Sequence, residues 1–190
     1  MYINYLSLML INLAAGLSLL AAYVYFGLDG KNQKRWIPGF GVVGAIALIT
    51  GLHMTLTWPI IGSFNIAYGE TSVLFGILFA GTSLSLAMGW ELVTLGIYGF
   101  FAGLLSFLTG IRIINLGLTP IPVPVGMGFI LVGLGGIFSA PTLYLKAPRL
   151  LRTIGAIVLI VAALFFTFVG LSAYWVHLAE FSAWKPLLTR

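Results

Sequence analysis

Ionisable side chains are scarce in this 190-residue chain, so the few that fall at helical spacing are candidates for chemistry. His53 is one of two histidines, and Thr50, His53 and Thr57 recur at intervals of three and four residues, which places them on one helix face. A histidine ring can relay protons or contact a ligand, and it can also simply hold helices together through hydrogen bonds. Both roles stay open for His53.

Glu70 and Arg112 are a second pair of candidates. An arginine within a membrane is costly alone, and a carboxylate at the same depth would stabilise it through bidentate hydrogen bonds. Alternatively, both side chains extend separately to the headgroups. Polar residues also recur along two other segments: Glu91, Thr94, Tyr98, Thr109 and Arg112, and then Thr167, Tyr174 and His177. Because an unsatisfied polar group in hydrocarbon costs several kcal/mol, we expect these stripes to face the interior of a helix bundle.

The composition places the whole chain in a lipid bilayer. Hydrophobic residues make up 61% and charged residues 7%, against roughly 45–50% and about 25% in soluble domains. Several apolar stretches are near the roughly 20 residues that a helix needs to cross the hydrocarbon. We therefore predict an all-α polytopic integral membrane protein, a single bundle of six transmembrane helices over residues 4–27, 38–58, 70–89, 91–116, 125–145 and 152–176.

Prolines and short links set the expected boundaries. Proline lacks an N–H and clashes with the preceding turn, so Pro38 suits a helix start and Pro59 stops the helix after Trp58. Pro141 should kink the fifth span, and the link 88–92 suggests a tight antiparallel pair of spans three and four. The tryptophans fall near span ends, as an interfacial belt requires.

Lysine and arginine are concentrated in the connections 28–37 and 146–152, which the positive-inside rule places in the cytoplasm. Both termini are then outside a cell membrane. At about 1.5 Å per residue, His53 lies inside the hydrocarbon, while Glu70, Arg112 and His177 lie near its outer boundary. The sequence thus predicts a polar outer vestibule.

Several chemistries are unsupported. The net charge of +5 is scattered rather than gathered into a basic face, which argues against nucleic acid. The absence of cysteine removes disulfides, thiolate metal sites and iron–sulfur clusters. The segment 39–44 has the letters of a dinucleotide fingerprint but falls within a span, so its glycines indicate close helix packing. We find no hydrolase motif and no metal site, and enzymatic activity is not indicated.

Haem b is an alternative cofactor, with His53 and His177 as axial ligands. The depth estimate separates these residues by more than about 10 Å, which disfavours a shared iron. Another alternative is an inverted repeat of three plus three spans, because segments 37–51 and 123–137 both carry a proline followed by spaced glycines.

Three strings, MYINYLSLMLINLAAGL, TGLHMTLTWPIIGSFNIAYGE and GIRIINLGLT, resemble a family of small prokaryotic multi-spanning membrane proteins known only as a domain of unknown function. The resemblance implies a polytopic membrane protein and no particular activity. It gives emphasis to the following residues within the matching strings: His53, Trp58, Glu70, Arg112 and Asn115.

Three functions follow as hypotheses. The first is a non-enzymatic bundle that binds or passes a small solute or proton through the outer vestibule. The second is a structural or accessory subunit, in a homo-oligomer or a larger membrane complex. The third is a haem or quinone electron-transfer subunit. The candidate pathway residues are Thr50, His53, Thr57, Trp58, Glu70, Arg112, Asn115, Tyr174 and His177.

Overall fold

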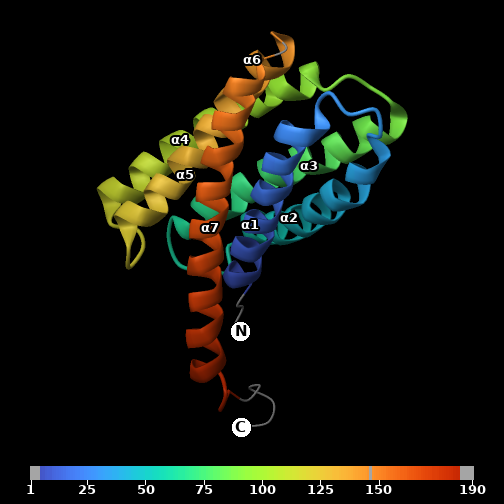
Figure 1. Cartoon of the computed structure of the whole chain (residues 1–190). Helices are drawn as coiled ribbons and strands as arrows, with labels where there is room; N and C mark the ends of the chain where they lie inside the picture. Colours follow the sequence, from blue (N-terminus) through green and yellow to red (C-terminus); the bar gives the residue numbers. More distant parts are fainter. Residues whose placement is uncertain (1–4, 146, 185–190) are drawn as a thin grey trace.

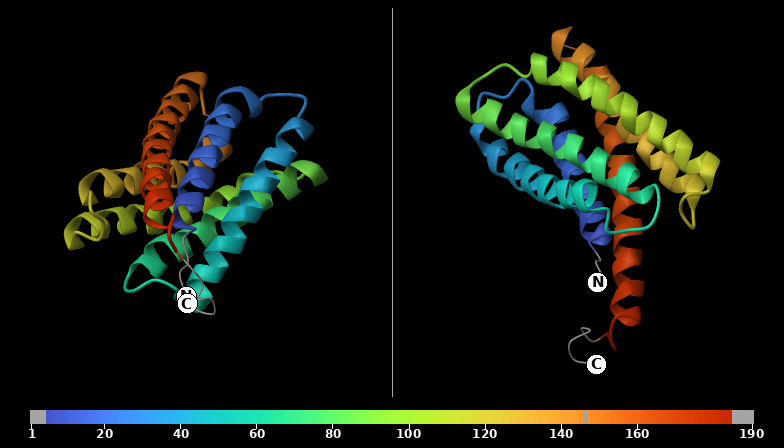
Figure 2. Two further views of the ribbon diagram at one scale, coloured as in Figure 1. Left: turned by 90° about the horizontal axis from the view of Figure 1, so that it is seen from below. Right: turned by 180° about the vertical axis from the view of Figure 1, so that it is seen from behind.

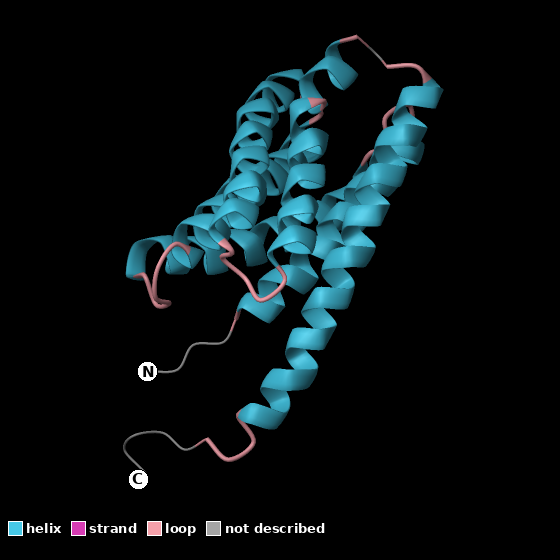
Figure 3. Ribbon diagram, turned by 90° about the vertical axis from the view of Figure 1, so that its left-hand side faces the viewer, coloured by secondary structure: helices cyan, strands magenta, loops and turns pink. Residues whose placement is uncertain are grey.

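The computed structural model describes residues 5–145 and 147–184, and within these ranges the chain is all helical. Six helical segments of the described chain are long and apolar enough to cross a membrane: Leu6–Gly27, Lys34–Thr57, Asn65–Met88, Val93–Leu116, Pro122–Tyr144 and Arg149–Glu180. The prediction of an all-α protein with six membrane-spanning helices is confirmed (Figure 3).

The spans are built from seven α-helices: α1 (Leu6–Ala22), α2 (Ile37–Thr57), α3 (Thr71–Met88), α4 (Val93–Leu116), α5 (Pro122–Ile137), α6 (Ser139–Tyr144) and α7 (Arg149–Glu180). Two π-helical turns, η1 (Tyr23–Gly27) and η3 (Asn65–Glu70), extend α1 at its end and α3 at its start. A 3-10 turn, η2 (Lys34–Trp36), leads into α2.

The helices are arranged as three closely packed pairs, α1 with α7, α2 with α3, and α4 with α5 (Figure 1). The α4–α5 hairpin crosses the α1–α7 pair at a steep angle, and α2 and α3 cover the other side of α1 (Figure 2). The start of α1 and the end of α7 lie at one end of the bundle, which we call the terminal end. The connection 28–33 and the start of α7 lie at the opposite end, the loop end (Figure 1).

Glycines explain why two of these pairs pack so closely. A side-chain carbon added at Gly44 would lie 2.5 Å from the Ala80 backbone nitrogen, and one at Gly103 would lie 2.5 Å from the Ile137 nitrogen. The backbones of each hairpin are therefore nearly in contact, as small residues allow in membranes. The interpretation of the 39–44 segment as helix packing agrees with the place of Gly44.

Helix ends follow the prolines in most places. Pro38 lies in the first turn of α2, and α2 ends at Trp58, which adopts a left-handed conformation (φ 45°) directly before Pro59. The third span begins at Asn65 rather than at residue 70, so Glu70 lies within the helix and not at its start. Asn65 is buried and its side-chain amide donates to the carbonyls of Ile60 and Gly62, which organises the preceding turn.

The fifth span is broken between α5 and α6, at Phe138. Pro141 lacks the N–H that would bond the Ile137 carbonyl, and its ring would clash with that carbonyl in a continuous helix. The predicted kink is therefore confirmed. The span starts earlier than expected, at Pro122, because the first N–H groups of a helix need no internal partner.

Two expectations about helix pairing are wrong. The link after Met88 does not create a tight pair, since α3 packs mainly on α2 and α4 mainly on α5. The packing also lacks the symmetry that an inverted repeat of three plus three spans would show. Span three packs mainly on span two, whereas span six packs mainly on span one instead of span five. The hydrophobic length of each span could not distinguish these pairings.

Candidate functional site

A cavity of about 620 Å³ runs between the three helix pairs, and every membrane span contributes to its wall. On α3 and its leading turn, the lining extends from Tyr68 to Thr82, and on α7 it includes the stretch from Arg152 to Phe166. At about 1.5 Å per residue, each stretch covers about 21 Å of the roughly 30 Å hydrocarbon thickness. We call this cavity the lumen.

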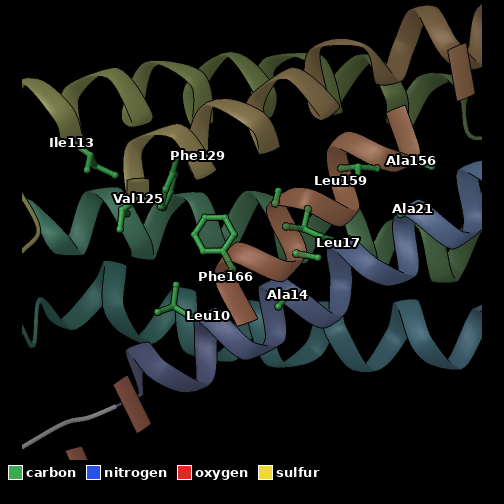
Figure 4. Close-up of a cluster of buried hydrophobic side chains, with 12 residues drawn as sticks. Leu10, Ala14, Leu17, Ala21, Ile113, Val125, Phe129, Ala156, Leu159 and Phe166 are labelled. Carbon is green, nitrogen blue, oxygen red and sulfur yellow. The ribbon is translucent and has the colours of Figure 1, made fainter. Parts of the chain in front are cut away.

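Aromatic rings close the lumen towards the terminal end. Tyr68 and Phe129 meet edge to face with ring centroids 5.5 Å apart, and Phe129 meets Phe166 with centroids 5.9 Å apart. Figure 4 shows Phe166 reaching from α7 towards Leu10 of α1 and Phe129 of α5. The Ser106 hydroxyl donates to the Phe129 carbonyl at 2.9 Å, which fixes α5 against α4 at this level.

Each π-helical turn places a tyrosine on the lumen, Tyr23 from η1 and Tyr68 from η3. No hydrogen bond to another described residue uses either phenol hydroxyl. Such turns interrupt regular helix geometry and are frequent at functional sites. The two tyrosines therefore offer polar groups at opposite ends of an otherwise apolar passage.

Small polar side chains complete the wall. The Thr71 hydroxyl donates to the Ala67 carbonyl, and the Thr82 hydroxyl donates to the Leu78 carbonyl one turn earlier. The Ser139 hydroxyl lies 2.6 Å from the Gly136 carbonyl of α5 and 2.9 Å from the Gly96 carbonyl of α4, and it can donate to either. A hydroxyl bonded in this way keeps its oxygen lone pairs as acceptors. Asn12 is buried, donates from Nδ2 to the Val43 carbonyl at 3.0 Å, and has no partner for Oδ1 among the described residues. These residues add hydrogen-bond acceptors to a wall that already carries the two phenol hydroxyls.

Arg152 is the charged residue of the lumen lining. Its side chain is 15% exposed, and Nη2 lies 2.6 Å from Oδ2 of Asp29, which is 78% exposed. This is the one ion pair found among residues 5–145 and 147–184. The Arg152 Nε is buried without a hydrogen-bond partner in the same ranges. A cation therefore stands at the loop end of the lumen.

The two histidines lie outside the lumen, beside the start of α1. His53 Nδ1 is 3.0 Å from the Tyr5 hydroxyl, and His177 Nδ1 is 3.3 Å from the Ser7 hydroxyl. Burial raises the pKa of the Tyr5 phenol, so its hydroxyl stays protonated and can donate to His53. Each histidine thus joins its own helix, α2 or α7, to α1.

The two histidine rings have separate hydrogen-bond partners at the start of α1, Tyr5 for His53 and Ser7 for His177. Their role as axial ligands of a haem stays a prediction. The described residues also contain no cluster of three or more His, Cys, Asp or Glu side chains. The ring geometry favours structural hydrogen bonds.

No ion pair joins Glu70 to Arg112 among the described residues. The ion pair found there joins Arg152 to Asp29. Arg112 and Asn115 are exposed near the end of α4, whose buried face is formed by glycines, Ser106 and Ile113. Glu70 is half-buried on the α3 side of the bundle. Because α4 turns its glycine face to α5, the side that carries Arg112 is directed outwards.

The remaining candidates do not reach the lumen either. Thr50 and Thr57 donate to carbonyls of α2 itself, at Ile46 and His53. Thr57, Trp58 and Tyr174 are exposed. His53 and Arg112 are exposed as well, so the stripes that carry them face outwards rather than into the lumen, contrary to the predicted inward orientation. Their part in a pathway stays a prediction.

The sequence reasoning missed the residues that line the lumen. Asn12, Tyr68, Ser106 and Arg152 are single polar residues within apolar helices, and only Asn12 and Ser106 are fully buried. The available signal was the glycine spacing of α4, which marks its buried face and includes Ser106 in register with Gly99, Gly103 and Gly110. For Arg152 the sequence indicates only a place in the cation-rich connection 146–152.

The outer surface is apolar at mid-membrane positions. Ile49, Phe101, Leu164 and Phe168 are all more than 60% exposed. Large apolar side chains directed away from the bundle need lipid or another apolar surface. The protein is a multi-pass membrane protein whose helices contact lipid.

Comparisons with known proteins agree with this architecture. The family described as "Protein of unknown function (DUF981)" matches residues 1–180. No curated protein sequence matches the chain. A cryo-electron microscopy structure of the Helicobacter pylori urea channel in a closed state is similar in fold, with a TM-score of 0.71 over 90% of this chain and 97% of that chain. Sequence identity is 14%, so the likeness concerns the fold.

Proposed function

The chain belongs to the DUF981 family, and from its lumen and fold we propose that it passes small, uncharged, N–H-bearing solutes of the urea and simple amide class across a membrane. The observation that carries this proposal is the lumen, which extends from Tyr68 to Arg152 through the bundle. A purely structural subunit has no need of such a passage. The fold shared with a urea channel supports the same assignment.

The lining favours neutral solutes over ions. Moving an ion from water into an apolar passage is costly unless charged groups replace its hydration shell. Arg152 is positively charged, which adds a barrier to cations such as sodium and hydronium. A proton pathway is therefore the weaker form of the solute hypothesis.

The hydrogen-bond acceptors in the wall favour solutes with N–H groups. Hydroxyl oxygens at Thr71, Thr82 and Ser139 retain lone pairs, and Asn12 adds an amide oxygen. A urea-like molecule carries more donors than acceptors and can replace its water partners stepwise along such a wall.

The aromatic contact at the terminal end gives the passage a closed form. Tyr68, Phe129 and Phe166 fill the lumen where the three helix pairs converge. Hydrophobic constrictions can gate conduction by excluding water. Rotation of one ring, most simply Tyr68 on its π-helical turn, would open this end.

The experiment is solute flux into proteoliposomes that contain the full chain, followed by light scattering after mixing with urea, acetamide or glycerol. We expect urea and acetamide to enter faster than into protein-free vesicles of the same lipid, with no increase in sodium permeability. Equal rates in both vesicle types would contradict the proposal and favour the accessory-subunit alternative. We further propose that the protein lies in the cell membrane with its loop end in the cytoplasm, as the cation distribution predicts.

A further inference from the structure

The loop end of the lumen has a cationic wall that is only partly neutralised. Arg152 offers five N–H donors, and its recorded ion pair uses Nη2 alone. The partner Asp29 is 78% exposed, so water screens the carboxylate, whereas the guanidinium is largely buried. The other lysine and arginine side chains of the described ranges are exposed. Arg152 is therefore set apart from the loop cations around it.

An unpaired donor at this position needs a physical reason. Arg152 Nε is buried and has no partner among the described residues. A buried donor without an acceptor costs on the order of 1–3 kcal/mol, and more when the group is charged. An acceptor oxygen that enters from the lumen, with a small shift of the side chain, would remove this cost.

Open space lies next to the guanidinium. Gly155 follows Arg152 by three residues on α7, so the two share a helix face, and both line the lumen. A side-chain carbon added at Gly155 would meet no atom within 4 Å, unlike the tightly packed Gly44 or Gly103. The Thr142 hydroxyl, which has no hydrogen bond to another described residue, lines the same end.

We propose that Arg152, with the open space at Gly155, forms a binding site for the carbonyl oxygen of a small neutral amide at the loop end of the lumen. The inference rests on the proposed passage and names the residue that selects the solute. A neutral carbonyl fits better than a carboxylate, because the surrounding lining is apolar and a carboxylate would lose its hydration there. The guanidinium supplies charged N–H donors, which no other described residue of the lining provides.

The test compares flux of urea, acetamide, glycerol and formate into proteoliposomes with the full chain. We expect Arg152→Gln to lower the ratio of urea to glycerol permeability at least about tenfold, the loss typical of one hydrogen bond to a charged group. Arg152→Lys should lower the same ratio, because lysine lacks the planar N–H fork, and should still exclude sodium. Arg149→Gln is the matched control, since Arg149 is exposed one turn earlier and should leave the ratio unchanged.

Gly155 variants test the space without disturbing the ion pair. Gly155→Leu should abolish urea and acetamide flux in a folded protein, because the leucine side chain would fill the open space. Asp29→Asn should retain the urea preference, because Asp29 does not line the lumen.

The outcomes separate the two proposals. Wild-type vesicles that take up urea no faster than empty ones would overturn the passage itself. Wild-type uptake together with unchanged ratios in both Arg152 variants, or normal uptake in Gly155→Leu, would overturn only the site. Formate entering the wild type as readily as urea would overturn its assignment to neutral amides.

Discussion

The rings of Tyr68 and Phe129 meet edge to face, with centroids 5.5 Å apart and an interplanar angle of 86°. Tyr68 comes from the π-helical turn before α3, and Phe129 from α5, so the contact joins two helix pairs across the lumen. Edge-to-face aromatic pairs contribute about 0.5–1.5 kcal/mol beyond their buried area. An interaction of this size can hold a passage closed and still break on a functional timescale.

We expect Tyr68→Ala to widen the terminal end and raise glycerol permeability several-fold in proteoliposomes, while Tyr68→Phe keeps wild-type exclusion. The matched control is Phe64→Ala, because Phe64 stacks on Tyr68 at 6.1 Å but does not line the lumen. Wild-type exclusion of glycerol by a folded Tyr68→Ala protein would show that this contact is not the constriction.

Gly103→Ala should destabilise the α4–α5 hairpin. The added carbon would lie 2.5 Å from the Ile137 nitrogen and 2.6 Å from the Gly133 carbonyl oxygen, so the helices must separate. Overpacking of this kind typically costs about 1–3 kcal/mol. Thermal unfolding in detergent should show a lower midpoint for Gly103→Ala and an unchanged or higher midpoint for Gly155→Ala. Equal midpoints would contradict the close packing of this hairpin.

The His53→Gln variant tests whether the solute pathway includes His53, as the sequence suggests, or runs through the lumen without it. If His53 belongs to the pathway, the substitution abolishes flux in a folded protein. Since the lumen lining does not include His53, we expect urea flux to be retained, with a loss of about 0.5–1.5 kcal/mol for the hydrogen bond to Tyr5. Loss of flux without loss of folding would restore His53 to the pathway.

The orientation prediction can be tested by cysteine labelling, because the chain has no natural cysteine. Asn32 lies in the first connection at the loop end and Ser63 lies between α2 and the third span, and both are exposed. In intact cells, an impermeant maleimide should label Ser63→Cys and spare Asn32→Cys until the cells are opened. The reverse pattern would place the loop end outside.

The sequence predicts the spans well because hydrophobic length is a local property. The prolines at 38, 59 and 141 also act locally, through a missing N–H and a ring clash, and their effects appear where expected. The third span starts earlier than predicted because Asn65 bonds the carbonyls of Ile60 and Gly62 in the preceding turn, a local side-chain arrangement that hydrophobic length does not reveal.

The candidate site was less accessible to sequence reasoning. His53 and Arg112 attracted attention as rare ionisable residues, but the direction of a side chain depends on which helix face packs. That face is set by glycines, as on α4, where Gly103 and Gly110 are buried and Arg112 is exposed. The sequence does not distinguish Arg152 from the other cations of the connections, because only the fold places it beside Asp29 and on the lumen wall.

Passage of solute through the lumen can be tested by blocking the lumen at Ser72. Ser72 lines the lumen from α3, and its replacement by cysteine changes little in size. The matched control is Ser172→Cys, exposed on α7 and outside the lining. Both variants are modified with N-ethylmaleimide, a small uncharged reagent, and the extent of modification is measured by mass. We predict that modified Ser72→Cys loses most of its urea flux into proteoliposomes, while Ser172→Cys modified to the same extent keeps it. Unchanged urea flux through fully modified Ser72→Cys would contradict the claim.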